Sequence, residues 1–90
     1  MYELVYTHQF KRSLRRCVKR GLDVLLLKEV VEVLRKGETL PAKYRAHRLS
    51  GKYANCWECH IQPDWLLLWE IKDGELLLIL LDTGSHADFF

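Results

Sequence analysis

The spacing of hydrophobic residues changes several times along the 90 residues, and each change marks a predicted element. Tyr2–Tyr6 is a short run of aliphatic and aromatic residues, which is typical of a strand. From Thr7, a suitable N-cap, apolar residues recur at helical spacing until Gly21 ends the pattern. Asp23 caps a second amphipathic helix, which ends at Gly37. We expect the two helices to form a hairpin with one shared apolar side, which the rest of the chain covers.

The first predicted helix has two different sides. Its apolar stripe consists of Phe10, Leu14, Cys17, Val18 and Gly21, and its other side carries two i, i+4 rows of basic residues, Lys11, Arg15, Lys19 and Arg12, Arg16, Arg20. Residues 1–22 thus hold six basic residues against one acid, whereas residues 23–90 hold eight against eleven. The basic side is a candidate surface for a polyanion, and a solvated helix face explains it almost as well.

The second half of the chain alternates with the period of a strand. After the connection Glu38–Tyr44, which Pro41 breaks, we expect strands at Tyr44–Leu49, Trp57–Gln62, Trp65–Ile71 and Leu76–Leu81. The loop Gly51–Cys56 and the turns Pro63-Asp64 and Asp73-Gly74 join them. The sum is one α+β domain over residues 1–90, with an N-terminal strand and a two-helix hairpin packed on a mostly antiparallel sheet of four to five strands. The pattern leaves open where the first strand joins the sheet.

Composition narrows the setting in which the protein works. No stretch approaches the roughly 20 consecutive apolar residues of a membrane span, and the start of the chain lacks the basic-then-apolar pattern of a signal peptide. We therefore expect a cytoplasmic protein with no membrane association. In that compartment Cys17, Cys56 and Cys59 are expected to be reduced thiols.

Two histidines and a carboxylate fall close together in the predicted sheet. If Ser50 faces Trp57, His47 lies opposite His60 on the polar face, with Asp64 in the adjoining turn; such opposed residues have Cβ atoms about 4.5–5.5 Å apart. A histidine taken singly is more often a surface or half-buried residue with one hydrogen bond. The cluster favours chemistry instead, because imidazoles that titrate near neutral pH suit both proton transfers of RNA cleavage by the 2′-hydroxyl.

Basic and aromatic residues near these histidines fit an RNA substrate. Arg45, Arg48 and Lys52 flank His47 and are candidates to stabilise negative charge on a scissile phosphate. Trp65 and Phe90 are candidates to stack on an unpaired base, with core packing as the alternative for each.

Two metal-based interpretations compete with this one. Cys56-Trp57-Glu58-Cys59-His60 matches the C-x-x-C-H pattern of c-type haem attachment, and the same cysteines with a histidine suggest structural zinc. In a strand, however, residues three apart point to opposite faces, so the two thiols diverge. His47, His60 and His86 remain an alternative set of metal ligands. We expect no metal and no cofactor.

Three motifs together resemble the YafQ-type toxins of the RelE/ParE superfamily. They are His47-Arg48-Leu49-Ser50-Gly51, Cys59-His60-Ile61-Gln62-Pro63-Asp64-Trp65-Leu66-Leu67 and Thr83-Gly84-Ser85-His86-Ala87-Asp88-Phe89-Phe90, in an order of elements that matches essentially the whole chain. Each motif alone is weak, but their combination and separations are specific.

The resemblance implies a RelE-like fold and a metal-independent endoribonuclease that cuts translated mRNA in the ribosomal A site. It also implies a cognate antitoxin that holds the toxin inactive in an oligomer. The family's functional positions fall on His47, His60, Asp64, His86 and Phe90, with Trp65 beside them. By this resemblance His86 and His47 transfer protons, while His60 and Asp64 orient the phosphate or tune those histidines. Whether Phe89 or Phe90 contacts a base stays open.

Two other functions are compatible with such a chain. A ParE-like toxin inhibits gyrase by binding alone and needs no histidine cluster. A plain RNA-binding or ribosome-binding module needs only the basic helix and predicts salt-sensitive binding that survives loss of the histidines.

Overall fold

The structure, a computed structural model, describes residues 1–89. Its strands are β1 (Glu3–Tyr6), β2 (His47–Arg48), β3 (Trp57–Gln62), β4 (Trp65–Lys72) and β5 (Leu77–Gly84). Its α-helices are α1 (His8–Lys19), α2 (Val24–Arg35) and α3 (His86–Phe89), and the 3-10 turns are η1 (Ala42–Tyr44), η2 (Gly51–Tyr53) and η3 (Asp73–Glu75). None of these helices is long and apolar enough to cross a membrane.

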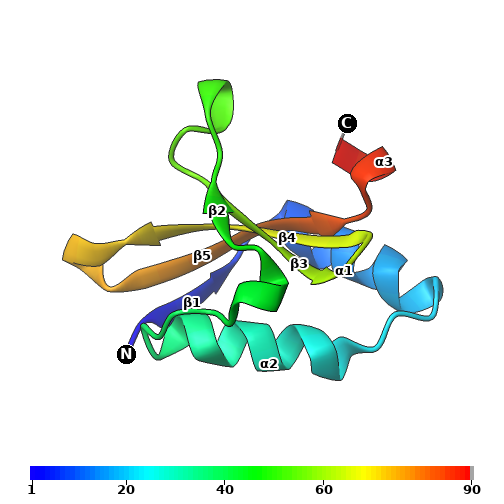
Figure 1. Cartoon of the computed structure of the whole chain (residues 1–90), viewed down its shortest axis with the longest axis horizontal. Coiled ribbons are helices and arrows are strands. Elements are labelled where there is room, and N and C mark those ends of the chain that lie inside the picture. The colour runs from blue at the N-terminus through cyan, green and yellow to red at the C-terminus, as the bar shows by residue number, and fades with distance from the viewer. Residues whose placement is uncertain (90) are drawn as a thin grey trace.

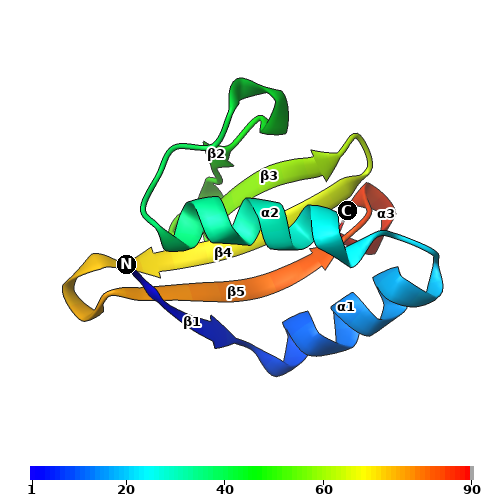
Figure 2. The same cartoon turned by 90° about the horizontal axis from the view of Figure 1, so that it is seen from below.

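The five strands form one sheet in the order β1-β5-β4-β3-β2 (Figures 1 and 2). The pairs β2–β3, β3–β4 and β4–β5 are antiparallel, and β1 lies parallel beside β5 with Val5 opposite Ile79. The predicted α+β architecture is therefore confirmed, and the place of the first strand is now known.

The caps at both long helices are those that the sequence predicts. The Thr7 hydroxyl accepts a hydrogen bond from the Phe10 amide at 2.9 Å, and the Asp23 carboxylate accepts one from the Leu25 amide at 3.0 Å. Gly21 and Gly37, with φ of 89° and 76°, follow the two helices in the left-handed region that glycine tolerates best. Local sequence thus determines where α1 and α2 begin and end.

Both long helices pack on one face of the sheet. Phe10 and Cys17 of α1 and Leu27, Val30, Val31 and Leu34 of α2 are buried against Cys59, Ile61, Trp65, Leu67, Trp69, Leu78 and Leu80 of the strands. The prediction that Val18 belongs to the apolar stripe is wrong, because its side chain is 52% exposed. The contact line of α1 runs through Phe10, Ser13 and Cys17, and Val18 lies about 100° beyond it around the helix.

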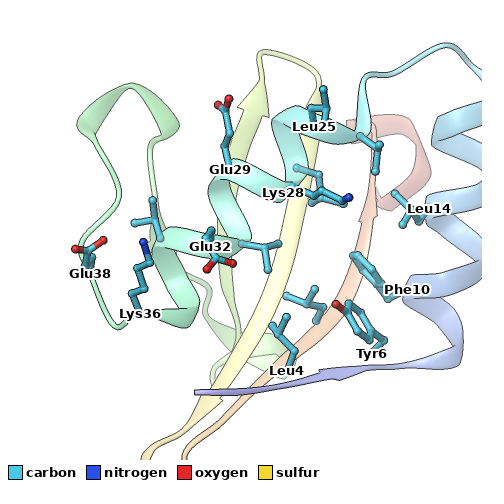
Figure 3. A pocket seen from close by; sticks show the side chains of 15 residues that line it. Leu4, Tyr6, Phe10, Leu14, Leu25, Lys28, Glu29, Glu32, Lys36 and Glu38 are labelled. Atoms are coloured by element: carbon cyan, nitrogen blue, oxygen red, sulfur yellow. The ribbon is translucent and has the colours of Figure 1, made fainter. Parts of the chain in front are cut away.

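The shared apolar side of the two helices is only partly covered by the sheet. Between α1 and α2 a cavity of about 840 Å³ remains open, lined mainly by apolar side chains and edged by charged residues of α2 (Figure 3). Tyr6 is 48% and Leu25 60% exposed along this groove. We call this feature the apolar groove.

The strand predicted at Tyr44–Leu49 is much shorter in the structure. Tyr44 belongs to η1, and Arg45 has a left-handed φ of 51°, so the chain turns before it reaches β2. The register also differs by two residues from the predicted one, since His47 pairs with Glu58 and not with His60. The prediction paired Ser50 with Trp57 at the loop. In the structure the Leu49 amide donates to the Cys56 carbonyl at 2.9 Å, so the pairing at the loop begins one residue earlier in each strand. A shift by two keeps His47 on the predicted face.

Candidate active site

The candidate catalytic side chains lie on the face of the sheet opposite the long helices. Cys59 and Ile61 of β3 point into the helix-covered core, so the alternating residues Glu58 and His60 point to the other face. Figure 1 shows the β2 hairpin and α3 rising on that side, away from α2. The two projections bring residues from the middle and the end of the chain to one surface.

His60, Asp64 and His86 form a compact cluster. The Asp64 carboxylate accepts two hydrogen bonds from His86, one from its backbone amide at 3.0 Å and one from ring Nδ1 at 2.9 Å. The rings of His60 and His86 are 5.6 Å apart between centroids. The predicted turn Pro63-Asp64 is present, and His60 Nδ1 lies 3.2 Å from the carbonyl of Pro63 in that turn.

All three candidate histidines engage an oxygen through Nδ1. His47 Nδ1 lies 2.8 Å from the Arg45 carbonyl, His60 Nδ1 faces Pro63, and His86 Nδ1 faces Asp64. Carbonyl and carboxylate oxygens only accept, so each Nδ1 must carry a hydrogen. The proton that such a ring exchanges with a substrate is therefore the one on Nε2.

Hydrogen bonds from His86 lower the pKa of Asp64 below its usual value, with the backbone amide as the largest cause and the ring as the next. A lowered pKa means that the ionised carboxylate is the favoured form. The contact is therefore complete at neutral pH and is lost only as the pH falls through the lowered pKa.

We expect an NMR titration of the Asp64 carboxyl carbon to give a midpoint below about 3.9, the ordinary value for aspartate. In His86→Ala the backbone donor remains, so the midpoint should return only part of the way. An ordinary midpoint in the unmodified protein would contradict the geometry of this cluster.

A cleft of about 590 Å³ opens beside the cluster. His60, Pro63 and His86 form one wall, and Lys43 and Arg45 from the segment after α2 contribute two cations to the lining. Arg45, a predicted site residue, thus lines this cleft, and so does Lys43, which the sequence pattern did not single out. The cleft is smaller and more polar than the apolar groove, and it suits a charged substrate better.

His47 stands beside a buried carboxylate that sequence reasoning missed. Its Nε2 is 3.5 Å from Oε1 of Glu58, whose side chain is only 7% exposed. The other oxygen, Oε2, has no hydrogen-bond partner among the described residues. The signal was present in the sequence, because Glu58 alternates with His60 on the same strand face.

Two predicted cations are not brought to the cleft. Arg48 lies over the ring of Trp57, at 5.7 Å from its centroid, on the helix side of the sheet. Lys52 lies over Tyr53 at 5.2 Å in η2. Neighbouring residues of a strand point to opposite faces, which separates Arg48 from His47.

Trp65 is not an exposed surface for a base, so that prediction is wrong. Its side chain is 1% exposed, and its indole donates to the Thr83 hydroxyl at 2.8 Å. That hydroxyl donates in turn to the Leu66 carbonyl at 2.7 Å, so the ring is part of the core. Phe90 lies outside the described residues, while Phe89 is half-buried in α3.

Within residues 1–89 no three His, Cys, Asp or Glu side chains converge as a metal site. Cys59 is fully buried, and desolvation raises the pKa of its thiol to about 12, which disfavours the thiolate that a metal would bind. The C-x-x-C-H sequence lies partly in β3, where Cys59 and His60 point to opposite faces.

Comparison with known proteins identifies the family. The sequence profile described as "Bacterial toxin of type II toxin-antitoxin system, YafQ" matches residues 2–90. The mRNA interferase toxin YafQ of Escherichia coli K12 is 32% identical over 89 residues, which cover 98% of this chain and 95% of that protein.

Solved structures agree with this result. A metal-bound toxin from Helicobacter pylori is 38% identical, with each chain covered completely and a TM-score of 0.93. The E. coli DinJ-YafQ complex is 31% identical, covers 100% of this chain and 99% of its own, and gives a TM-score of 0.90. The chain therefore belongs to the YafQ family of bacterial type II toxins, within the RelE superfamily.

Proposed function

We propose that this protein is an mRNA interferase, a ribosome-dependent endoribonuclease that cuts translated mRNA in the A site. The observation that carries the proposal is the cluster of His60, Asp64 and His86, in which Nδ1 of each imidazole lies against an oxygen and Nε2 is the ring nitrogen that we assign to proton exchange. The relative named as an mRNA interferase supports it. Because translating ribosomes are in the cytoplasm, we propose that the protein acts there.

The proposed reaction starts with the 2′-hydroxyl of the RNA, which loses its proton and attacks the adjacent phosphate. One imidazole takes that proton and another protonates the departing 5′-oxygen, and we assign these two steps to His86 and His47. His60 orients the phosphate, and Asp64 holds the ring of His86 in place. Arg45 and Lys43 line the cleft where negative charge develops. We also propose that Phe89 or Phe90 contacts a base of the RNA.

Translation dependence tests this function. Expression of the protein should create new mRNA 5′ ends inside reading frames, and a reporter whose start codon is destroyed should stay intact. Cleavage of both reporters would exclude a ribosome-dependent enzyme.

Gyrase supercoiling in the presence of the purified protein should be unchanged, because a cluster of proton-transfer groups serves no purpose in an inhibitor that only binds.

We also propose that a cognate antitoxin neutralises this toxin and docks in the apolar groove. The E. coli relative forms a complex with DinJ, which makes an antitoxin the expected occupant. Exposed Tyr6 and Leu25 line the groove, and a monomer rarely leaves apolar surface of this kind in water without a partner. An amphipathic antitoxin helix would bury them.

Leu25→Glu should weaken antitoxin binding by about tenfold or more, because it places a charge in an apolar interface. The matched control is Val18→Glu, which changes an equally exposed apolar residue of α1 outside the groove. Titration calorimetry with the purified antitoxin measures both. Unchanged affinity in Leu25→Glu would remove the groove from the interface.

A further inference from the structure

We infer that Arg20 and Asp88 form a positioning clamp that fastens α3, and with it His86, to the end of α1. The inference rests on the proposed function, which gives His86 a proton-transfer role. It adds two positioning residues, Arg20 after the last turn of α1 and Asp88 in α3, which act through the placement of His86 and not on the reacting atoms.

The contact between the two side chains is bidentate. Arg20 Nη1 donates to Asp88 Oδ2 at 2.8 Å, and Nη2 donates to Oδ1 at 3.1 Å. Arg16, one turn earlier, lies 3.8 Å from the same carboxylate, whose side chain is only 11% exposed. This parallel geometry fixes the direction of approach as well as the distance. Figure 2 shows α3 at the same end of the molecule as the end of α1.

The same carboxylate also closes the turn that carries His86. Asp88 Oδ2 accepts a hydrogen bond from the Ser85 amide at 2.8 Å, which is one half of a capping box, and the Asp88 amide donates to the Ser85 backbone carbonyl at 3.0 Å. A Cβ on Gly84 would lie 2.5 Å from Asp88 Oδ2, so glycine is needed for this close approach. These hydrogen bonds hold the pKa of Asp88 well below its usual range, and the bond from Arg20 has the largest effect. The carboxylate is therefore ionised at neutral pH.

α3 needs an external anchor because it is short. A helix of four residues is not stable alone. Asp64 anchors His86 from the β3–β4 turn, yet its own side chain is 70% exposed. The half-buried clamp supplies the second anchor, two residues after His86.

A role of Arg20 in RNA binding predicts different kinetics from a role in the clamp. Arg20 lines a pocket with Asp64 and Ser85, and the competing hypothesis is that its guanidinium binds RNA phosphate there. Arg20→Gln and Asp88→Asn change the net charge in opposite directions. RNA binding by Arg20 predicts a raised KM for Arg20→Gln and unimpaired cleavage by Asp88→Asn. The clamp predicts that both variants lose kcat by about 10- to 100-fold and that the double variant loses no more.

The test combines cleavage kinetics on programmed ribosomes with amide hydrogen exchange of the isolated protein. In both clamp variants the His86 amide, which donates to Asp64, should exchange faster, whereas Arg15→Gln, which removes a guanidinium from the same helix, should leave it unchanged. Unchanged exchange and kcat in Asp88→Asn would overturn the clamp. If the unmodified protein cuts no mRNA, the proposed function fails, while hydrogen exchange still decides whether the clamp exists.

Discussion

His86→Ala is expected to lower the rate of mRNA cleavage by about 10²–10⁴-fold, the range for loss of a general acid or base. Growth arrest on expression should disappear with it. His86 is the residue on which the site converges, since Asp64 fixes its ring and its amide and the ring of His60 lies 5.6 Å away. Its side chain is 53% exposed, so the substitution removes little core packing and the protein should stay folded.

The matched control is His8→Ala, which removes an exposed histidine at the start of α1, far from any role in the proposed chemistry. It should cleave at the normal rate. Circular dichroism should show the same thermal unfolding for both variants within a few degrees. A folded His86→Ala protein that remains toxic would disprove the assignment of His86 as a proton-transfer residue.

Trp65→Ala is expected to cost about 3–5 kcal/mol of folding free energy, the usual range for removing a large aromatic side chain from a core. That is a large part of the roughly 5–15 kcal/mol that stabilises a typical domain. Trp65 packs in the buried cluster and donates to Thr83, so its loss opens a cavity and leaves a buried hydroxyl with one partner fewer.

Urea denaturation followed by circular dichroism measures this loss. The unfolding free energy of Trp65→Phe should lie between those of the unmodified protein and Trp65→Ala, because phenylalanine keeps an aromatic ring but lacks the indole donor. Tyr53→Ala, which removes an aromatic ring that is 41% exposed, provides the control and should have little effect. A fully stable Trp65→Ala protein with impaired cleavage would restore the hypothesis that this indole stacks on a base.

The elements that local sequence could predict are those with strong caps or periodicity. Thr7, Asp23, Gly21 and Gly37 bound the long helices as expected, and β3 has its predicted limits. The parallel pairing of β1 with β5 joins the two ends of the chain, so no local pattern encodes it. The left-handed backbone of Arg45, which ends η1 before β2, could not be predicted either, because arginine has no preference for that conformation.

The candidate site was predictable in part for similar reasons. The turn and the alternation of β3 placed His60 and Asp64, whereas the role of His86 in proton transfer came from the family resemblance, because no local pattern fixes how α3 approaches the turn. The burial of Trp65 was implied by a strand that is apolar on both faces. Glu58 alternates with His60 on the same face of β3, but a single glutamate in a strand carries no motif that singles it out.

The most direct test of the central claim is cleavage of mRNA with one 2′-deoxynucleotide at the scissile position. Ribosomes programmed with all-ribose mRNA should yield one cut in the A-site codon, and the modified mRNA should remain intact because no 2′-hydroxyl is present to attack. Equal cleavage of both mRNAs, or of neither, would contradict an interferase that works through the imidazoles of His47 and His86.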